Sequence, residues 1–190
     1  MDIGLYFGSF NPIHIGHLII VNHILNETGL QKIWLVLSPQ NPFKTTEELL
    51  NESKRLSLAE KAIHGDSRIS VSDVEFKLSL PSFTINTLAY LKEKYPQHDF
   101  TIIMGSDSLQ NLHKWKDSEA IVRDYKILIY RRAGFEPENK INAKIEILNA
   151  PLLDISSTEI RKLIKDEKSI RYLVPEEVRE EIEKNQYYKK

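Results

Sequence analysis

The sequence predicts an α/β fold in which a doubly wound parallel sheet carries helices on both faces. Short apolar runs alternate with longer amphipathic segments along the chain. The apolar runs at 33–37 and 101–104 are continuous, which is typical of strands that are covered on both faces. Strands that alternate with helices favour crossover connections, and these connections produce a parallel sheet.

The individual elements follow from the same patterns. We expect strands at 3–7, 33–37, 69–71, 101–104, 126–130 and 144–148, and helices at 15–28, 47–64, 84–95, 118–124, 157–165 and 175–184. Gly29 and Pro96 stand just beyond two of these helices, where such residues commonly end a helix. A chain of 190 residues has room for one domain of this kind. We therefore expect a single domain over 1–190, with a frayed polar tail at 185–190.

Composition excludes several classes of function. The formal net charge is −1, whereas nucleic-acid binding usually requires a basic excess, so we expect no nucleic-acid partner. The chain has no cysteine, which excludes disulfides, thiolate nucleophiles and cysteine zinc sites. No signal-peptide pattern is visible, and no segment has the roughly 20 apolar residues of a membrane span. We expect a cytoplasmic protein without a membrane partner, and a homo-oligomer stays open.

The loop after the first expected strand is the first candidate site. Ligands of such sheets bind beyond the carboxyl ends of the strands. Gly8 permits a close approach of the backbone to a ligand, while Gly16 and His17 fall in the first turn of the next helix, whose N-terminus attracts phosphate. His14 and His17 are three residues apart and can face one bound group. A zinc site is disfavoured because no Glu lies between them and no third ligand is near.

A second candidate site is the sequence Ile-Ser-Ser-Thr-Glu-Ile-Arg at 155–161. Ser156 and Glu159 form a capping box that opens an amphipathic helix. Capping does not account for Arg161, which lies one turn beyond Ser157 and on the same side as Thr158. Two hydroxyls and a guanidinium beside a helix N-terminus predict a second phosphate-binding cradle.

Both motifs resemble those of the HxGH nucleotidyltransferase superfamily. Residues 8–17 are similar to its signature Gly-Gly-[Ser/Thr]-Phe-[Asp/Asn]-Pro-x-His-x-Gly-His, with Phe7 in place of the first Gly, and 155–161 are similar to Ile-Ser-Ser-Thr-x-Ile-Arg. Class I aminoacyl-tRNA synthetases share His-Ile-Gly-His, but their Lys-Met-Ser-Lys-Ser-like loop is absent here. The resemblance implies a Rossmann-like doubly wound sheet of the nucleotidyltransferase type.

The middle of the chain resembles bacterial nicotinate-nucleotide adenylyltransferases in particular. The resemblance rests on Pro-Phe-Lys at 42–44, Ser-Phe-Thr-Ile-Asn-Thr-Leu at 82–88, Gly-Ser-Asp at 105–107 followed by Trp115, and Tyr-Leu-Val-Pro at 172–175. Asn11 and Asn86 stand where many bacterial members carry Asp. The implied reaction joins ATP and nicotinate mononucleotide to give nicotinate adenine dinucleotide and pyrophosphate in NAD synthesis.

Three alternatives stay open. A nicotinamide mononucleotide or dual-specificity adenylyltransferase is one of them, because the Ser-Phe-Asn-Pro form at 9–12 is also common in relatives that accept nicotinamide mononucleotide. A pantetheine-phosphate adenylyltransferase shares the first motif, although such enzymes typically carry Thr-Asn-Gly-His where this chain has His-Ile-Gly-His. A catalytically silent nucleotide-sensing module would be expected to lose a motif histidine or arginine, and both kinds of residue are present.

The resemblance and the local chemistry together assign roles to individual residues. We assign catalysis to His14, His17, Lys44 and Arg161. We assign ATP binding to Gly8, Ser9, Phe10, Gly16, Gly105, Asp107, Ile155, Ser156, Ser157 and Thr158, with a helix N-cap as the alternative for Asp107. We assign mononucleotide binding to Asn11, Phe83, Thr84, Ile85 and Trp115. We expect Mg²⁺ to arrive with ATP, since no carboxylate cluster predicts a metal site built by the protein. Arg55 is expected on a solvated helix face.

Overall fold

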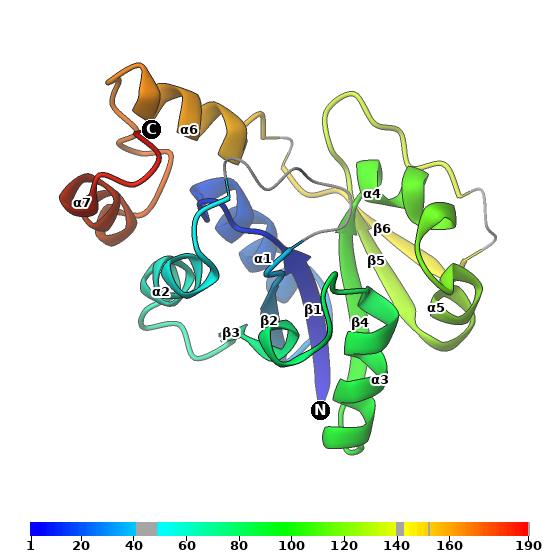
Figure 1. The fold of residues 1–190 in the computed structure, drawn as a ribbon. Helices are drawn as coiled ribbons and strands as arrows, with labels where there is room; N and C mark the ends of the chain where they lie inside the picture. The colour runs from blue at the N-terminus through cyan, green and yellow to red at the C-terminus, as the bar shows by residue number, and fades with distance from the viewer. Residues whose placement is uncertain (41–48, 140–142, 152, 190) are drawn as a thin grey trace.

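A computed structural model describes residues 1–40, 49–139, 143–151 and 153–189. Its centre is a six-stranded sheet with the order β3-β2-β1-β4-β5-β6, and all neighbouring strands run parallel (Figure 1). The strands are β1 (Asp2–Gly8), β2 (Lys32–Leu37), β3 (Ile69–Ser72), β4 (Asp99–Gly105), β5 (Lys126–Tyr130) and β6 (Ile145–Leu148). The predicted doubly wound parallel sheet is confirmed.

Helices cover both faces of this sheet. They are α1 (Ile15–Glu27), α2 (Glu52–Ala62), α3 (Thr84–Lys94), α4 (Ser106–Asn111), α5 (Ser118–Asp124), α6 (Ser157–Lys165) and α7 (Glu176–Asn185), with short 3₁₀ turns η1 (Val74–Lys77) and η2 (Leu112–Lys114). Buried side chains of α1, α2, α6 and α7 share one core cluster, and those of α3, α4 and α5 share the other. The fold therefore has three layers, with the sheet in the middle.

Alternation along the strands explains how one sheet feeds two cores. In β4, Ile103 belongs to the α1-side cluster whereas Ile102 belongs to the α3-side cluster. In β5, Leu128 faces the α1 side while Ile127 and Ile129 face the α3 side. Successive side chains of a strand point to opposite faces, so a continuous apolar run buries both of them.

The predicted frayed tail at 185–190 is wrong for its described part. Helix α7 ends at Asn185, and Tyr187 and Tyr188 then pack against the α1-side core. The amide of Tyr187 donates to the carbonyl of Ile182 at 3.0 Å. The ammonium of Lys54 lies 4.9 Å from the centre of the Tyr187 ring. Two aromatic rings therefore anchor this segment to the core. The polar residues around them had suggested a frayed terminus.

The predicted solvated position of Arg55 is also wrong. Its side chain is 0% exposed, although it lies in a helix whose other polar residues face solvent. Helix α2 begins at Glu52, later than expected, with Asn51 capping it by accepting from the amide of Ser53 at 3.0 Å. Helical periodicity could not reveal that the inward neighbours of Arg55 are backbone carbonyls. Among the described residues, no helix has the length and apolar character needed to cross a membrane.

Candidate active site

A cavity opens where the order of the strands reverses. Strands β2 and β3 follow on one side of β1, whereas β4, β5 and β6 follow on the other. Ligands bind such sheets outside the carboxyl ends of the strands near this point. A cavity of about 730 Å³ lies there, which is within the usual range for small-molecule sites.

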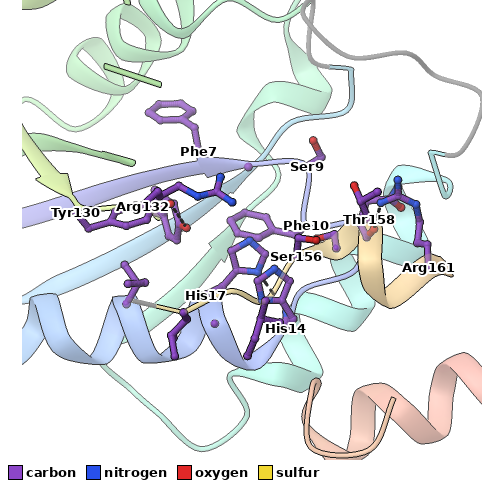
Figure 2. A pocket seen from close by; sticks show the side chains of 18 of the residues that line it. Phe7, Ser9, Phe10, His14, His17, Tyr130, Arg132, Ser156, Thr158 and Arg161 are labelled. Carbon is purple, nitrogen blue, oxygen red and sulfur yellow. Dashed lines mark hydrogen bonds between the residues drawn. The ribbon is translucent and has the colours of Figure 1, made fainter. Parts of the chain in front are cut away.

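The cavity brings the two predicted phosphate motifs together. Tyr130 and Arg132 appear on one side of the two imidazoles, with Ser156, Thr158 and Arg161 on the other (Figure 2). The predicted site residues among its lining are Gly8, Ser9, Phe10, Asn11, His14, Gly16, His17, Ile155, Ser156, Ser157, Thr158 and Arg161. The lining residues that sequence reasoning missed are Tyr6, Phe7, Ile20, Leu49, Tyr130, Arg131, Arg132, Pro151 and Leu153.

The turn after β1 is organised around the ring of Phe10. Phe10 has a positive φ of 44° and is only 3% exposed. A Cβ on Gly8 would lie 2.8 Å from this ring, so a side chain at that position would displace it. The ring meets Tyr6 and His17 edge-on, with centroid distances of 5.7 Å and 5.1 Å. In this structure, Gly8 makes room for Phe10, which in turn supports His17.

The two motif histidines form one unit at the start of α1. His14 occupies the N-cap position in an extended conformation, and its amide donates to Nδ1 of His17 at 3.2 Å. Because Nδ1 accepts this bond, a neutral His17 ring carries its proton on Nε2. The rings stack with their centroids 3.6 Å apart. Burial, and next the charge of Arg132, lower the pKa of His14 to about 4, so His14 is neutral at pH 7.

Gly16 has a steric reason to lie between these histidines. A Cβ at this position would stand 3.0 Å from Nδ1 and 3.1 Å from Cε1 of His14. Such contacts are tighter than side chains normally make, so His14 would have to move. Glycine at this position therefore lets the His14 ring pack closely against the start of the helix.

The start of α6 is hydrogen-bonded to the first turn. Ser156 caps the helix by accepting from the amide of Glu159 at 3.2 Å. Ser157 Oγ donates to the carbonyl of Pro12 at 2.9 Å, and Arg161 Nη1 donates to the carbonyl of Asn11 at 3.0 Å. These bonds hold the positive N-terminal end of α6 beside the turn that follows β1. Two segments about 150 residues apart in sequence thereby form one anion-attracting wall.

Gly105 and Asp107 lie behind the cavity wall instead of in it. Gly105 is the N-cap of α4, and Asp107 lies within the first turn of that helix, so the N-cap alternative for Asp107 is wrong. The Asp107 carboxylate pairs with Nη1 of Arg132 at 2.9 Å, and Arg132 lines the cavity. A Cβ on Gly105 would collide with both of these side chains. Gly105 therefore leaves room for an ion pair that directs an arginine toward the site.

Asn11 lines the cavity, but the other predicted mononucleotide-binding residues form a separate group. Phe83, Thr84, Ile85 and Trp115 are not among the residues that line the cavity. Phe83 is the N-cap of α3, and the ammonium of Lys116 lies 5.0 Å from the centre of its ring. Trp115, the neighbour of Lys116, is half-buried against the α3-side core. The two predicted segments thus meet beside α3, while Lys44 lies outside the described residues.

A tyrosine pair, with Tyr6 buried and Tyr130 partly buried, completes the wall opposite α6. The hydroxyls of Tyr6 and Tyr130 are 2.9 Å apart, and burial raises the pKa of both phenols above its ordinary value. Tyr130 ends β5 and Arg132 follows it, so both stand at the carboxyl edge of the sheet. The sequence shows that Tyr130 and Arg132 are polar residues at the end of a strand, which is a weak indication of a site. Their proximity to β1 depends on the order of the strands, which the sequence does not show.

Comparison with known proteins identifies the family. The cytidylyltransferase-like family model matches residues 5–163, a span that includes both phosphate motifs. The chain belongs to the cytidylyltransferase-like family.

Named relatives resemble the chain over its whole length. A "Probable nicotinate-nucleotide adenylyltransferase" of Flavobacterium johnsoniae is 48% identical and covers 100% of both chains. Its counterpart in Cytophaga hutchinsonii is 47% identical over 99% of this chain and 98% of its own length. The solved structure of Plasmodium falciparum nicotinic acid mononucleotide adenylyltransferase complexed with NaAD superposes with a TM-score of 0.83 at 25% identity, covering 98% of this chain and 97% of that one.

Proposed function

We propose that this chain transfers the adenylyl group of ATP to nicotinate mononucleotide, giving nicotinate adenine dinucleotide and pyrophosphate in NAD biosynthesis. The main support for this proposal is that the His14–His17 pair and the cradle at the start of α6 line the same cavity. The names of the full-length relatives support the same substrate, and the matched Plasmodium structure holds the corresponding dinucleotide product.

Direct transfer needs no nucleophile from the protein. The 5′-phosphate oxygen of the mononucleotide attacks the α-phosphorus of ATP, and the bond from that phosphorus to the bridging oxygen breaks. Pyrophosphate leaves with the electron pair of that bond. The protein contributes position and neutralises charge on the α-phosphate and the leaving group. These tasks suit a rigid wall of hydrogen-bond donors such as the one around the cavity.

The phosphate-facing roles follow from the protonation states and the positions of the donors. We assign Nε2–H of His17 to the α- and β-phosphates, and His14 to the region of the transferred phosphoryl group. Because His14 is neutral at pH 7, positive charge must come from elsewhere. We assign that charge to Arg161 and the N-terminus of α6, with Ser157 and Thr158 at the β/γ end. Thr158 is the hydroxyl donor there, whereas the Ser157 hydroxyl donates to the Pro12 carbonyl and holds the start of α6 in place. We also place Ser9, Ile155 and Ser156 beside the phosphates. Together, the turn after β1 and the start of α6 form what we call the phosphate wall.

The remaining assignments stay proposals. We place the ATP ribose near Gly105 and Asp107, whose carboxylate is held in place by Arg132. We place the pyridine ring on Trp115, with its carboxylate at the backbone of 83–85. Lys44 is proposed as a cation over the phosphates. Single-domain extent over 1–190 and cytoplasmic location also stay predictions, and homo-oligomerisation stays open.

We propose that the divalent cation of this reaction is Mg²⁺ and that it arrives with ATP. Mg²⁺ is usually held by substrate phosphates and one or two carboxylates, with water as the other ligands. In the described part of the chain, no group of three or more His, Asp or Glu side chains is placed to hold a metal ion. When bound, the cation would neutralise charge on the phosphates of ATP.

Release of pyrophosphate from ATP tests the proposal directly. Nicotinate mononucleotide, nicotinamide mononucleotide and phosphopantetheine are supplied in parallel, each with ATP and Mg²⁺. We expect the highest kcat/KM with nicotinate mononucleotide. A higher kcat/KM with nicotinamide mononucleotide or with phosphopantetheine would show that the proposed substrate is wrong. No release with any of the three would favour a nucleotide-sensing module without catalysis.

A further inference from the structure

Arg55 donates four hydrogen bonds to backbone carbonyls while it is completely buried. Its Nη1 donates to Ser9 at 2.6 Å and to Ser38 at 2.8 Å, and its Nη2 donates to Pro39 at 2.9 Å. Its Nε donates to Leu50 at 2.7 Å. Arg55 is not among the residues that line the cavity, so it does not act on the substrates by contact.

The four carbonyls belong to three different segments at the carboxyl edge of the sheet. Ser9 follows β1, Ser38 and Pro39 follow β2, and Leu50 precedes α2. A further bond joins two of these segments, since the amide of Ser38 donates to the carbonyl of Gly8 at 2.9 Å. A single guanidinium therefore joins the end of β1, the end of β2 and the approach to α2.

Only arginine has the donor geometry that this position uses. Its guanidinium presents five N–H groups in a rigid plane, so one side chain can reach carbonyls that lie in several directions. A lysine at position 55 would bring three donors on a single nitrogen and could not reproduce this fork. Burial lowers the pKa of Arg55 from its ordinary value, but the guanidinium stays protonated at neutral pH.

The turn after β1 is thus held by arginines from two helices. Arg55 of α2 holds the carbonyl of Ser9, and Arg161 of α6 holds the carbonyl of Asn11. Between these two carbonyls lies Phe10, whose ring contacts His17 edge-on. A shift of the turn at Ser9 would therefore be passed through Phe10 to His17.

We propose that Arg55 is a positioning residue for adenylyl transfer, acting through the Ser9 carbonyl to fix the turn that supports His17. The inference rests on the proposed function, because adenylyl transfer is the reaction in which the position of His17 would matter. Misplacing a catalytic group by about 1 Å can cost about 100-fold in rate. Loss of Arg55 should therefore lower kcat much more than it raises either KM.

The test compares Arg55→Lys and Arg55→Met with the wild type and with Leu91→Ala. Leu91 lies in the α3-side core, is 1% exposed and does not line the cavity, so its truncation lowers stability without touching the first turn. Each protein is assayed well below its Tm, and rates are divided by the folded fraction measured by circular dichroism. We expect kcat to fall about 10- to 100-fold in Arg55→Met and less in Arg55→Lys, with each KM within about threefold of the wild type. Leu91→Ala should keep the wild-type kcat.

The outcomes separate this inference from the proposed function. A wild type and a Leu91→Ala variant that are both inactive with nicotinate mononucleotide would overturn the function and the inference with it. An active wild type with Arg55 variants that retain full kcat would overturn the inference alone. Failure of both Arg55 variants to fold would also overturn it, because the residue would then be required for the fold itself.

Discussion

His14 and His17 stack nearly parallel, with ring centroids 3.6 Å apart and planes inclined by 26°. A proton on one ring would place a charge directly against the other ring in a buried site. His14, which is neutral at pH 7, therefore acts through hydrogen bonding and not as a cation. Positive charge is supplied around it by Arg132 and Arg161, which line the same cavity.

Stability should fall as the pH drops from about 6.5 to about 4, in part because of His14. Its pKa is about 4 in the folded protein and near 6.5 when unfolded, so the unfolded chain binds more protons in this window. The loss should be about 3 kcal/mol, at about 1.4 kcal/mol per pKa unit. Urea unfolding at several pH values measures this loss. In His14→Gln, the free energy of unfolding should depend less on pH between about 4 and about 6.5. An identical slope in the variant would contradict the assignment.

Replacing His17 should remove catalysis while leaving the fold intact. Loss of a positioned donor to a developing oxyanion typically costs about 10²- to 10³-fold in kcat, and we expect His17→Ala to lie in this range. Steady-state pyrophosphate release and thermal unfolding measure the two effects. His64→Ala is the matched control, since His64 is exposed and does not line the cavity. Near-normal turnover of His17→Ala would contradict its role.

Gly16→Ala should reduce activity although alanine is the better helix former. The new Cβ would stand 3.0 Å from Nδ1 of His14 and push that ring away from its place in the stack. We expect about a tenfold or greater loss of kcat, because small displacements of catalytic groups are costly. Gly29→Ala is the control, since a Cβ there meets nothing within 4 Å. Equal activities of the two variants would show that the stack tolerates the methyl group.

The Asp107–Arg132 pair should contribute to ATP binding. We expect Arg132→Ala to raise the KM for ATP about tenfold, as is typical for loss of a charge-assisted hydrogen bond. Asp107→Asn should have a smaller effect in the same direction, because it loosens the arginine without removing it. Arg123→Ala is the control, since its ion pair with Asp124 is exposed and does not line the cavity. If only the KM for the mononucleotide changed, the pair would belong to the mononucleotide site and not to the ATP site.

Trp115→Ala should weaken binding of the mononucleotide selectively. Stacking of an aromatic side chain on a base is worth about 1–3 kcal/mol, so the KM for nicotinate mononucleotide should rise about 5- to 100-fold. The KM for ATP should change much less. Trp34→Phe is the control, because Trp34 packs against Tyr95 and Phe100 in the α3-side cluster. Similar changes in both KM values would argue against stacking.

Local patterns predicted most of the fold. The bounds of α5, β5 and α6 are those expected, because the apolar spacing of each segment and the Ser156 cap of α6 are local features of the sequence. The sequence also revealed the two phosphate motifs, since each is contiguous. The structure adds that they meet, through Ser157 and Arg161.

Features that depend on distant neighbours were not predictable. Tyr130 joins the site only because β5 lies two strands from β1, which places its hydroxyl 2.9 Å from that of Tyr6. Arg55 has the sequence context of a surface arginine, and its partners are backbone carbonyls from other segments. The tail was misjudged because composition does not show that Tyr187 finds an apolar surface.

The hydrogen bonds from α6 to Asn11 and Pro12 join two segments that are synthesised at different times. The turn after β1 leaves the ribosome before Ser157 and Arg161, which follow only after the six strands of the sheet have been made. A nascent chain can therefore possess its entire sheet and still lack half of the phosphate wall. Contacts between a nucleotide and the N-terminus of α6 are therefore possible only after Arg161 has been made, and the same step adds Ile160 and Ile164 to the α1-side core.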